Sequence, residues 1–358
     1  MYGIIENMSR QRNLSMDLLR VIACLMVVAV HANSSWKYFP IDSPQWRATI
    51  GYESFVRSAV LLFFMISGAF GRSTDIKKGA QKAFHYIIVF FLISLFYSVD
   101  DAILELTYGR RTSINTILNG IVDYKYHLWF LPTFVFLTFI SPFINRLFNS
   151  DKGKKVIYGY LIIWIIFGVI LRTAQLVTAG IDRFGIIGSS LEKLSFVPIL
   201  SENPIGCYCL GRIFMERRRS AGKNLGLFML GILSSIISLV LTIIYSTKLG
   251  SFDARFMHDT TVFILIQGIA WFCFVSGLSV SPSLSGLLEK IVPHTFGIYL
   301  IHVFFVDWLS RIKVFGEVNF CGIGIHPIVQ VPLRLLTVFI LSFLSLQLLS
   351  KIKSKDDH

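Results

Sequence analysis

An arginine and a histidine share one strongly apolar segment, SMDLLRVIACLMVVAVHANSS over residues 15–35. Arg20 and His31 are eleven residues apart, which places both on nearly the same face of a helix and about 16 Å apart along its axis. Imidazole, with an ordinary pKa of about 6.5, can take a proton at neutral pH, and guanidinium can bind phosphate. One helix would therefore carry a candidate general base and a candidate anion-binding group.

Each residue also has a structural interpretation. Arg20 could extend to lipid phosphates and His31 could lie at an interfacial helix end. Ionisable groups at the centre of a membrane helix cost about 2.5–3.5 kcal/mol, and they usually face a cavity or a partner. Asp17 lies on roughly the same side but too far along the helix to orient His31. A carboxylate partner for His31 would have to come from another helix.

Composition places the chain among multi-pass membrane proteins. Of its 358 residues 54% are hydrophobic and only 15% are charged, which a soluble domain could not cover. The net charge of +13 is attributed to basic inner loops, so we predict a lipid bilayer and no nucleic acid as partner. Five cysteines in no metal-binding or redox spacing predict neither a disulfide nor a metal site.

Apolar windows predict an all-α fold with about ten transmembrane helices in a single domain, residues 1–358, with short tails at 1–14 and 351–358. The predicted spans are 15–34, 53–71, 83–106, 127–148, 156–178, 197–215, 225–246, 259–280, 290–310 and 328–350. The sixth is the weakest because it contains Glu202 and Pro204. Glu202 would line a water-filled cavity, or its segment would be partly re-entrant.

Basic residues in alternate loops predict the orientation. Lys and Arg gather before the first span, in every second loop and in the C-terminal tail, whereas the other loops mix acids and bases. The positive-inside rule then places both termini in the cytoplasm, with Asp100 and Asp101 at the outer surface. A cleavable signal peptide ending at VHA is the alternative for the first segment. Asp17 and Arg20 interrupt it, and nine further spans need no removable signal.

Four motifs resemble the membrane acyltransferase 3 family. DLLRVIACLMVVAVH (17–31) is similar to the family's first helix, in which Arg, ten residues and His follow one another. FFMISG (63–68), HLWFL (127–131) and GIYLIH (297–302) resemble three later motifs in the same order, so the resemblance covers essentially the whole chain. It implies transfer of an acyl group, most often acetyl, from cytoplasmic acyl-coenzyme A to a carbohydrate hydroxyl outside the membrane.

The resemblance also implies roles for the donor side. His31 and Arg20 would be the catalytic residues, with His31 as the general base, and Arg20 would also engage coenzyme A with Lys77, Lys78 and Lys82. The family often has an Arg-x-x-Arg cluster where this chain has these lysines, and Lys lacks the bidentate fork of guanidinium. Loop lysines can equally be topology signals alone.

The acceptor side has its own candidates, each with an alternative. His127 and Trp129 would bind the carbohydrate, with Trp129 stacking on a sugar, or would anchor the helix at the interface. Tyr299 and His302 would line the channel, or form a structural pair. Beside the second motif's Ser67, Gly68 should permit a close helix contact.

The sequence thus predicts an O-acetyltransferase of a surface polysaccharide or its lipid-linked precursor, such as O-antigen or exopolysaccharide, in a bacterial inner membrane. Acetyl-CoA would be the donor substrate, and no metal is expected. A transporter or flippase of lipid-linked sugars is the main alternative, although no related halves are apparent. Another donor, such as succinyl-CoA, would suit the same residues.

Overall fold

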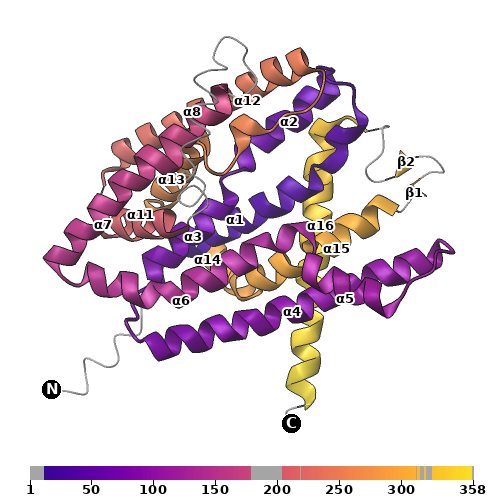
Figure 1. Ribbon diagram of the computed structural model, residues 1–358, viewed down its shortest axis with the longest axis horizontal. Coiled ribbons are helices and arrows are strands. Elements are labelled where there is room, and N and C mark those ends of the chain that lie inside the picture. The colour runs from indigo at the N-terminus through magenta and orange to yellow at the C-terminus, as the bar shows by residue number, and fades with distance from the viewer. Residues whose placement is uncertain are drawn as a thin grey trace.

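The computed structural model describes residues 12–178, 204–217, 219–311, 313–314, 318–319 and 325–356. These residues form a helical bundle with one antiparallel pair of two-residue strands (Figure 1). The long helices are α1 (Leu14–Ala32), α2 (Pro44–Val56), α3 (Ala59–Phe70), α4 (Ile76–Thr107), α6 (Phe130–Phe148), α7 (Asp151–Ile163), α11 (Pro204–Glu216), α12 (Ala221–Leu249), α13 (Val262–Ser276), α15 (Thr295–Arg311) and α16 (Pro327–Asp356). The shorter elements are η1 (Ser34–Tyr38), α5 (Ile114–Asp123), η2 (Tyr126–Trp129), η3 (Trp164–Ile170), α8 (Leu171–Thr178), η5 (Arg255–Met257), α14 (Pro282–Ile291), η6 (Val292–His294), β1 (Lys313–Val314) and β2 (Val318–Asn319).

Nine helical segments within the described residues are long and apolar enough to cross a bilayer. They confirm an all-α, multi-pass membrane protein. The predicted sixth span is described only in part: α11 covers its second half, while residues 197–203, with Glu202, lie outside the described residues. The predicted second span begins too late, because Pro44–Phe70 forms one candidate span that is broken near Arg57 and Ser58. The short helices α5 and α14 were not predicted.

The helix with both candidate residues lies at the centre of the bundle. Figure 1 shows α1 crossing the middle, with α12 and α13 on one side and α4, α5 and α6 on the other. It packs against α3, α15, α16 and α13. The Asn13 side chain caps its start by accepting a hydrogen bond from the Met16 amide at 3.2 Å. Residues placed on α1 can therefore face several helices at once.

Two glycines bring α3 and α11 into close contact. A Cβ on Gly68 would lie 1.8 Å from the Tyr208 carbonyl oxygen, and one on Gly211 would lie 1.9 Å from the Met65 carbonyl oxygen. Only glycine permits this approach of two backbones. The predicted close contact at Gly68 is confirmed. Ser67 donates a hydrogen bond to Phe63 of its own helix at 2.9 Å.

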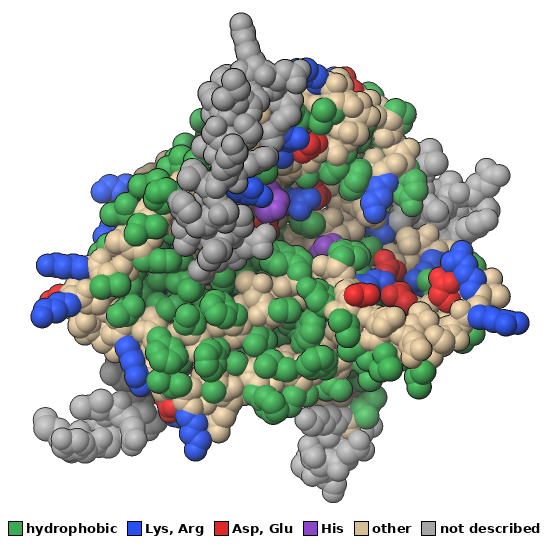
Figure 2. Space-filling view, viewed as in Figure 1, with side chains coloured by type: hydrophobic (Ala, Val, Ile, Leu, Met, Phe, Trp, Pro, Cys, Tyr) green, Lys and Arg blue, Asp and Glu red, His purple; other side chains and the backbone are tan. Residues whose placement is uncertain are grey.

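The outer surface of the bundle is apolar over wide areas. Exposed Phe84, Phe91 and Leu92 on α4 are typical of a face in contact with lipid. Figure 2 shows apolar side chains over much of one face, with histidine and charged side chains gathered around a hollow. Cys24, Cys207, Cys209 and Cys273 are buried free thiols, and Cys321 lies outside the described residues.

Candidate active site

Three histidines from three helical elements meet beside the end of α1. The ring centroid of His31 lies 5.1 Å from that of His302 on α15 and 6.1 Å from that of His127 on η2. The rings of His127 and His302 are 5.3 Å apart. His127 and His302 are almost completely buried, while His31 is half-buried. The structure thus brings together three predicted site residues that are widely separated in the sequence.

Backbone carbonyls indicate the tautomers of two of these histidines. Nδ1 of His302 lies 2.7 Å from the Tyr299 carbonyl oxygen and 3.2 Å from that of Ile298. A carbonyl only accepts, so Nδ1 carries the hydrogen and Nε2 keeps a lone pair. Nε2 of His127 lies 3.4 Å from the Leu300 carbonyl oxygen, which by the same reasoning leaves the lone pair on Nδ1. Both lone-pair nitrogens are buried without a hydrogen-bond partner among the described residues.

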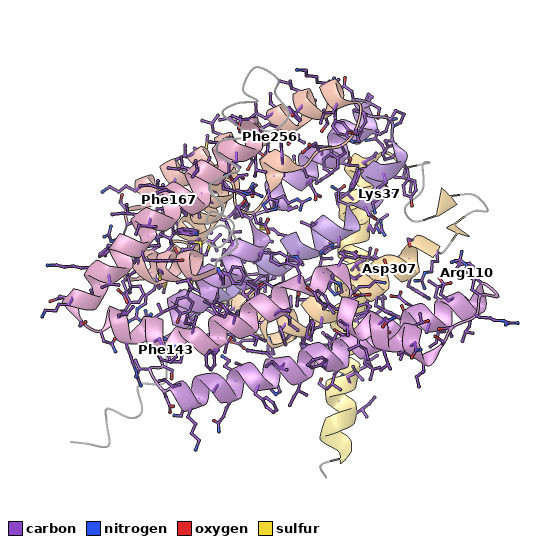
Figure 3. The ribbon with its side chains drawn as sticks, viewed as in Figure 1. Lys37, Arg110, Phe143, Phe167, Phe256 and Asp307 are labelled. Carbon is purple, nitrogen blue, oxygen red and sulfur yellow. The ribbon has the colours of Figure 1, made fainter. Side chains whose placement is uncertain are left out.

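The cluster is held by bonds between its helices. The Tyr299 hydroxyl donates to the His127 carbonyl oxygen at 2.8 Å, and the Tyr97 hydroxyl donates to the Leu300 carbonyl oxygen at 2.9 Å. Lys125, two residues before His127, forms ion pairs with Asp101 at 2.8 Å and with Asp307 at 3.2 Å. Burial lowers the pKa of Lys125, but the hydrogen bond that Lys125 donates to Asp101 and the charge of Asp307 raise it more. Figure 3 shows Asp307 at the end of α15 that faces α5.

A buried arginine ties the two histidine helices together. Arg334 of α16 donates to the Ala32 carbonyl oxygen at 3.1 Å, to the Ser34 hydroxyl at 3.0 Å and to the Val306 carbonyl oxygen at 3.0 Å. The Ala32 carbonyl belongs to the last turn of α1, directly after His31. These bonds stabilise the relative position of α1 and α15.

An ion pair that the sequence interpretation missed lies beside the histidines. Arg57 forms an ion pair with Glu53, and Glu53 also accepts a hydrogen bond from the Asn33 amide at 3.1 Å. Glu53 is 3% exposed, so its charge requires these partners. Arg57 and His31 line one cavity of about 110 Å³, the histidine cavity, together with His127 and Trp129. The Nε atom of Arg57 is buried without a hydrogen-bond partner among the described residues.

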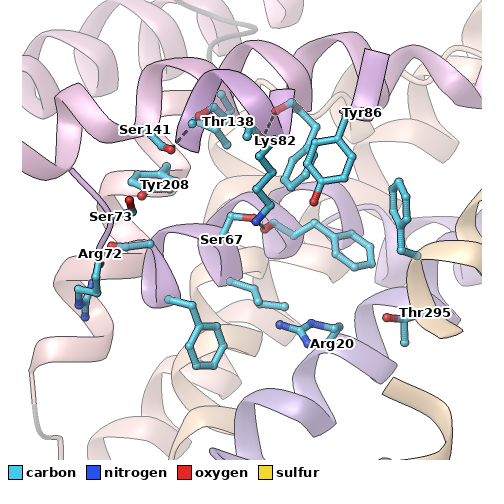
Figure 4. Close-up of a pocket in the computed structure, with 18 of the residues that line it drawn as sticks. Arg20, Ser67, Arg72, Ser73, Lys82, Tyr86, Thr138, Ser141, Tyr208 and Thr295 are labelled. Carbon is cyan, nitrogen blue, oxygen red and sulfur yellow. Dashed lines mark hydrogen bonds between the residues drawn. The ribbon is translucent and has the colours of Figure 1, made fainter. Parts of the chain in front are cut away.

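A much larger cavity, of about 940 Å³, opens beside the other end of α1. Arg20, Lys78, Lys82 and Arg72 are among the residues that line this basic cavity. Figure 4 shows Arg20 and Lys82 pointing into it from different helices. Arg20 is paired with Asp17 at 3.8 Å, with about a third of its side chain exposed. Lys77, the third predicted lysine, is not part of the wall.

Two further cations that the sequence interpretation did not select lie at this end. Arg12 lines the basic cavity and forms ion pairs with Asp17 at 2.5 Å and with Glu289 at 3.2 Å. Burial and the neighbouring charge of Arg212 lower the pKa of Arg72, while Glu216 raises it. Two guanidinium groups so placed repel one another, and an anion bound between them would relieve that repulsion.

The basic cavity and the histidine cavity share a wall. Phe63, Phe130 and Tyr299 line both of them. The rings of Phe130 and Tyr299 are 5.4 Å apart. The two cavities are therefore neighbours with these aromatic residues between them, and a long molecule in the basic cavity would end close to the histidines. Within the described residues no group of three or more His, Cys, Asp or Glu side chains is arranged to hold a metal ion.

Comparison with known proteins identifies the family of the chain. The family model described as an acyltransferase domain (Acyl_transf_3) matches residues 13–347. The chain belongs to this acyltransferase family. Its apolar helices and the family together support a membrane acyltransferase.

One curated relative is only partly comparable. The chain is 26% identical over 284 residues to the serine/alanine racemase of Enterococcus gallinarum, a match that covers 74% of this chain and 37% of that protein. The matched part therefore spans little more than a third of that relative. No solved structure matches the chain.

Proposed function

We propose that the protein transfers an acetyl group from cytoplasmic acetyl-CoA to a hydroxyl of a carbohydrate outside the membrane, such as O-antigen, exopolysaccharide or a lipid-linked precursor. The observation that carries this proposal is the wall of Phe63, Phe130 and Tyr299, shared by the basic cavity and the histidine cavity. This shared wall supports the proposal because a donor in the basic cavity and an acceptor in the histidine cavity would lie next to one another although they enter from opposite sides.

The basic cavity suits the donor. Coenzyme A carries several phosphates on a long, thin arm, and a cavity of about 940 Å³ has room for a molecule of that kind. Arg20, Arg72 and Lys82 would attract the phosphates, with Arg20 nearest to the centre of the bundle by its place on α1. The thioester would then lie at the aromatic wall, next to the histidines.

The histidine cavity suits the reaction. The acceptor hydroxyl gives its proton to a neutral imidazole, our first choice being His31, while its oxygen attacks the thioester carbon. The carbonyl oxygen becomes negative, and Arg57 would stabilise that charge. The carbon–sulfur bond then breaks, the ester is released, and the imidazolium returns the proton to the thiolate of coenzyme A. His302 and His127 would orient the acceptor or serve as the base instead.

Acetyl transfer by purified protein in liposomes tests the proposal. Labelled acetyl-CoA outside and carbohydrate acceptor inside should give labelled acceptor, and succinyl-CoA should react more slowly. Preferential use of succinyl-CoA would show that succinyl-CoA is the donor in place of acetyl-CoA. Transport of a lipid-linked sugar without any thioester cleavage would replace the proposal by the transporter interpretation, which the family match disfavours.

The orientation needs a separate test. The proposal requires both termini in the cytoplasm of a bacterial inner membrane, because the basic cavity must open there. Alkaline phosphatase fused after Lys355 should be inactive in a bacterial host. An active fusion would overturn the ten-span topology and, with it, the sides assigned to Arg20 and His31.

A further inference from the structure

A third cavity, of about 210 Å³, lies next to the histidine cavity. We call it the tryptophan cavity, because Trp129 and Trp164 line it together with His258 and Thr260. Val60, Trp129 and Asp259 belong to both cavities. The basic, histidine and tryptophan cavities therefore follow one another through the bundle, with the histidines in the middle.

We propose that the tryptophan cavity is the acceptor subsite and that it holds one pyranose ring of the carbohydrate. This inference rests on the proposed function and assigns the acceptor to particular residues. The cavity is smaller than a typical pocket for a drug-sized ligand, about 300–1,000 Å³. It can hold a single sugar unit but not an oligosaccharide, so the rest of the glycan would remain outside it.

The walls match the two kinds of surface on a sugar ring. The flat carbon–hydrogen face of a pyranose packs well against an indole, and its hydroxyls need hydrogen-bond partners. Trp164 is 3% exposed, and its Nε1 is buried without a hydrogen-bond partner among the described residues. Such an unused donor in a cavity wall suits a ligand oxygen. Trp129, 41% exposed, would cover the ring at the junction with the histidine cavity.

The polar end of the cavity comes from the loop before α13. Nδ1 of His258 lies 2.9 Å from the Thr260 hydroxyl and 3.4 Å from the Thr260 amide nitrogen. The amide can only donate, so Nδ1 is the acceptor and Nε2 carries the hydrogen. His258 is exposed and Thr260 is buried. The loop thus offers a fixed hydroxyl and a ring N–H to sugar hydroxyls.

Local backbone structure supports a ligand site at Trp164. This residue begins η3, a π-helical stretch from Trp164 to Ile170 within the fifth candidate span, and Val169 of the same stretch also lines the cavity. Stretches of π-helix are rare and often occur at functional sites. A Cβ on Gly206 would lie 2.4 Å from atoms of the Trp164 ring. The glycine therefore lets the indole lie directly against α11, which fixes its position.

The test separates acceptor binding from donor chemistry. In the source bacterium the gene is replaced by the Trp164→Leu, Thr260→Val or Leu265→Phe variant, the last of which fills the tryptophan cavity from its apolar side. Acetylation of surface glycans is measured by mass spectrometry. The same variants are purified, and their acetyl-CoA binding and their hydrolysis of acetyl-CoA without acceptor are compared with the wild type.

We expect Trp164→Leu and Leu265→Phe to reduce glycan acetylation about tenfold or more, and Thr260→Val to reduce it about fivefold, as expected for a lost hydrogen bond. Donor binding and hydrolysis should stay at the wild-type level, which also shows that the variants fold. Trp271→Leu is the matched control, because Trp271 packs against Phe228 and lines none of the three cavities.

Four outcomes would overturn the inference. Wild-type acetylation by folded Leu265→Phe protein would show that nothing needs to enter this cavity. An equal loss in Trp271→Leu would show that any lost tryptophan has the same effect. If deletion of the whole gene leaves glycan acetylation unchanged, or the wild-type protein neither binds nor hydrolyses acetyl-CoA, the proposed function itself fails, and the subsite falls with it.

Discussion

The basic cavity and the histidine cavity are built in opposite ways. The first is large, about 940 Å³, and its cations are partly exposed and come from several elements. The second is about 110 Å³ and is lined by His31 and His127, with the His302 ring directly beside both of them. Backbone carbonyls fix the rings of His127 and His302. Charge spread over many flexible side chains suits binding of a long anion, whereas proton transfer needs a few groups in fixed positions. The difference predicts large effects of substitution in the histidine cavity and graded effects in the basic one.

The largest expected effect is at the histidines. His31→Gln keeps a hydrogen-bonding group but has no useful basicity, and it should lower kcat for acetyl transfer about 10²–10⁴-fold with little change in acetyl-CoA binding. The wild-type rate should also fall on acidification, because imidazolium cannot accept a proton. Steady-state transfer rates across a pH series, with donor binding by calorimetry, provide the measurement.

Parallel variants decide which histidine is the base. His302→Gln and His127→Gln remove the other two lone pairs, and exposed His85 on α4 gives a control that should behave as wild type. Near-normal activity of His31→Gln with a large loss in His302→Gln would move the base to His302. It would leave the contrast between the two cavities intact.

Arg57→Lys should have the next largest effect. Lys keeps the charge that buried Glu53 needs, so the fold should survive, but the guanidinium no longer reaches the same place in the histidine cavity. We expect kcat to fall about 10²-fold with an unchanged KM for acetyl-CoA, as for a lost oxyanion donor. Arg47→Lys is the control, since Arg47 pairs with Asp42 at the surface at 2.8 Å. A change in KM alone would show that Arg57 binds the donor and does not stabilise the oxyanion.

Hydropathy and spacing were sufficient for most of the fold, because membrane helices must be apolar over a fixed length. They also identified Arg20 and His31 on one helix, whereas His127 and His302 were selected by the resemblance of their motifs to the family. Arg57 was missed because it lies at the break between α2 and α3, although Glu53 and Arg57 have the i, i+4 spacing of an ion pair. Trp164 was missed because a cavity tryptophan and a lipid-facing one look alike in sequence.

A graded effect is expected at Arg20. Arg20→Ala should raise KM for acetyl-CoA about tenfold and leave kcat nearly unchanged, because the other cations of the basic cavity still attract the phosphates. The KM of Arg20→Lys should lie between those of the wild type and Arg20→Ala, since Lys keeps the charge but lacks the bidentate fork of guanidinium. Donor affinity should also weaken as salt is raised. A collapse of kcat in folded Arg20→Ala protein would place Arg20 with the histidines and remove the contrast.

The smallest expected effect distinguishes Lys82 from Lys77, two lysines of α4. Lys78 and Lys82 are four residues apart on α4 and share a face, and both line the basic cavity, whereas Lys77 lies on another face and does not. Lys82 also lies 6.0 Å from the ring of Tyr86, another residue of the cavity wall. Lys82→Ala should raise KM for acetyl-CoA about threefold, as for one partly exposed charge among several, and Lys77→Ala should leave it unchanged. Equal changes of KM in the two variants would mean that only the total charge around the basic cavity matters. The donor would then be attracted without a defined contact to α4.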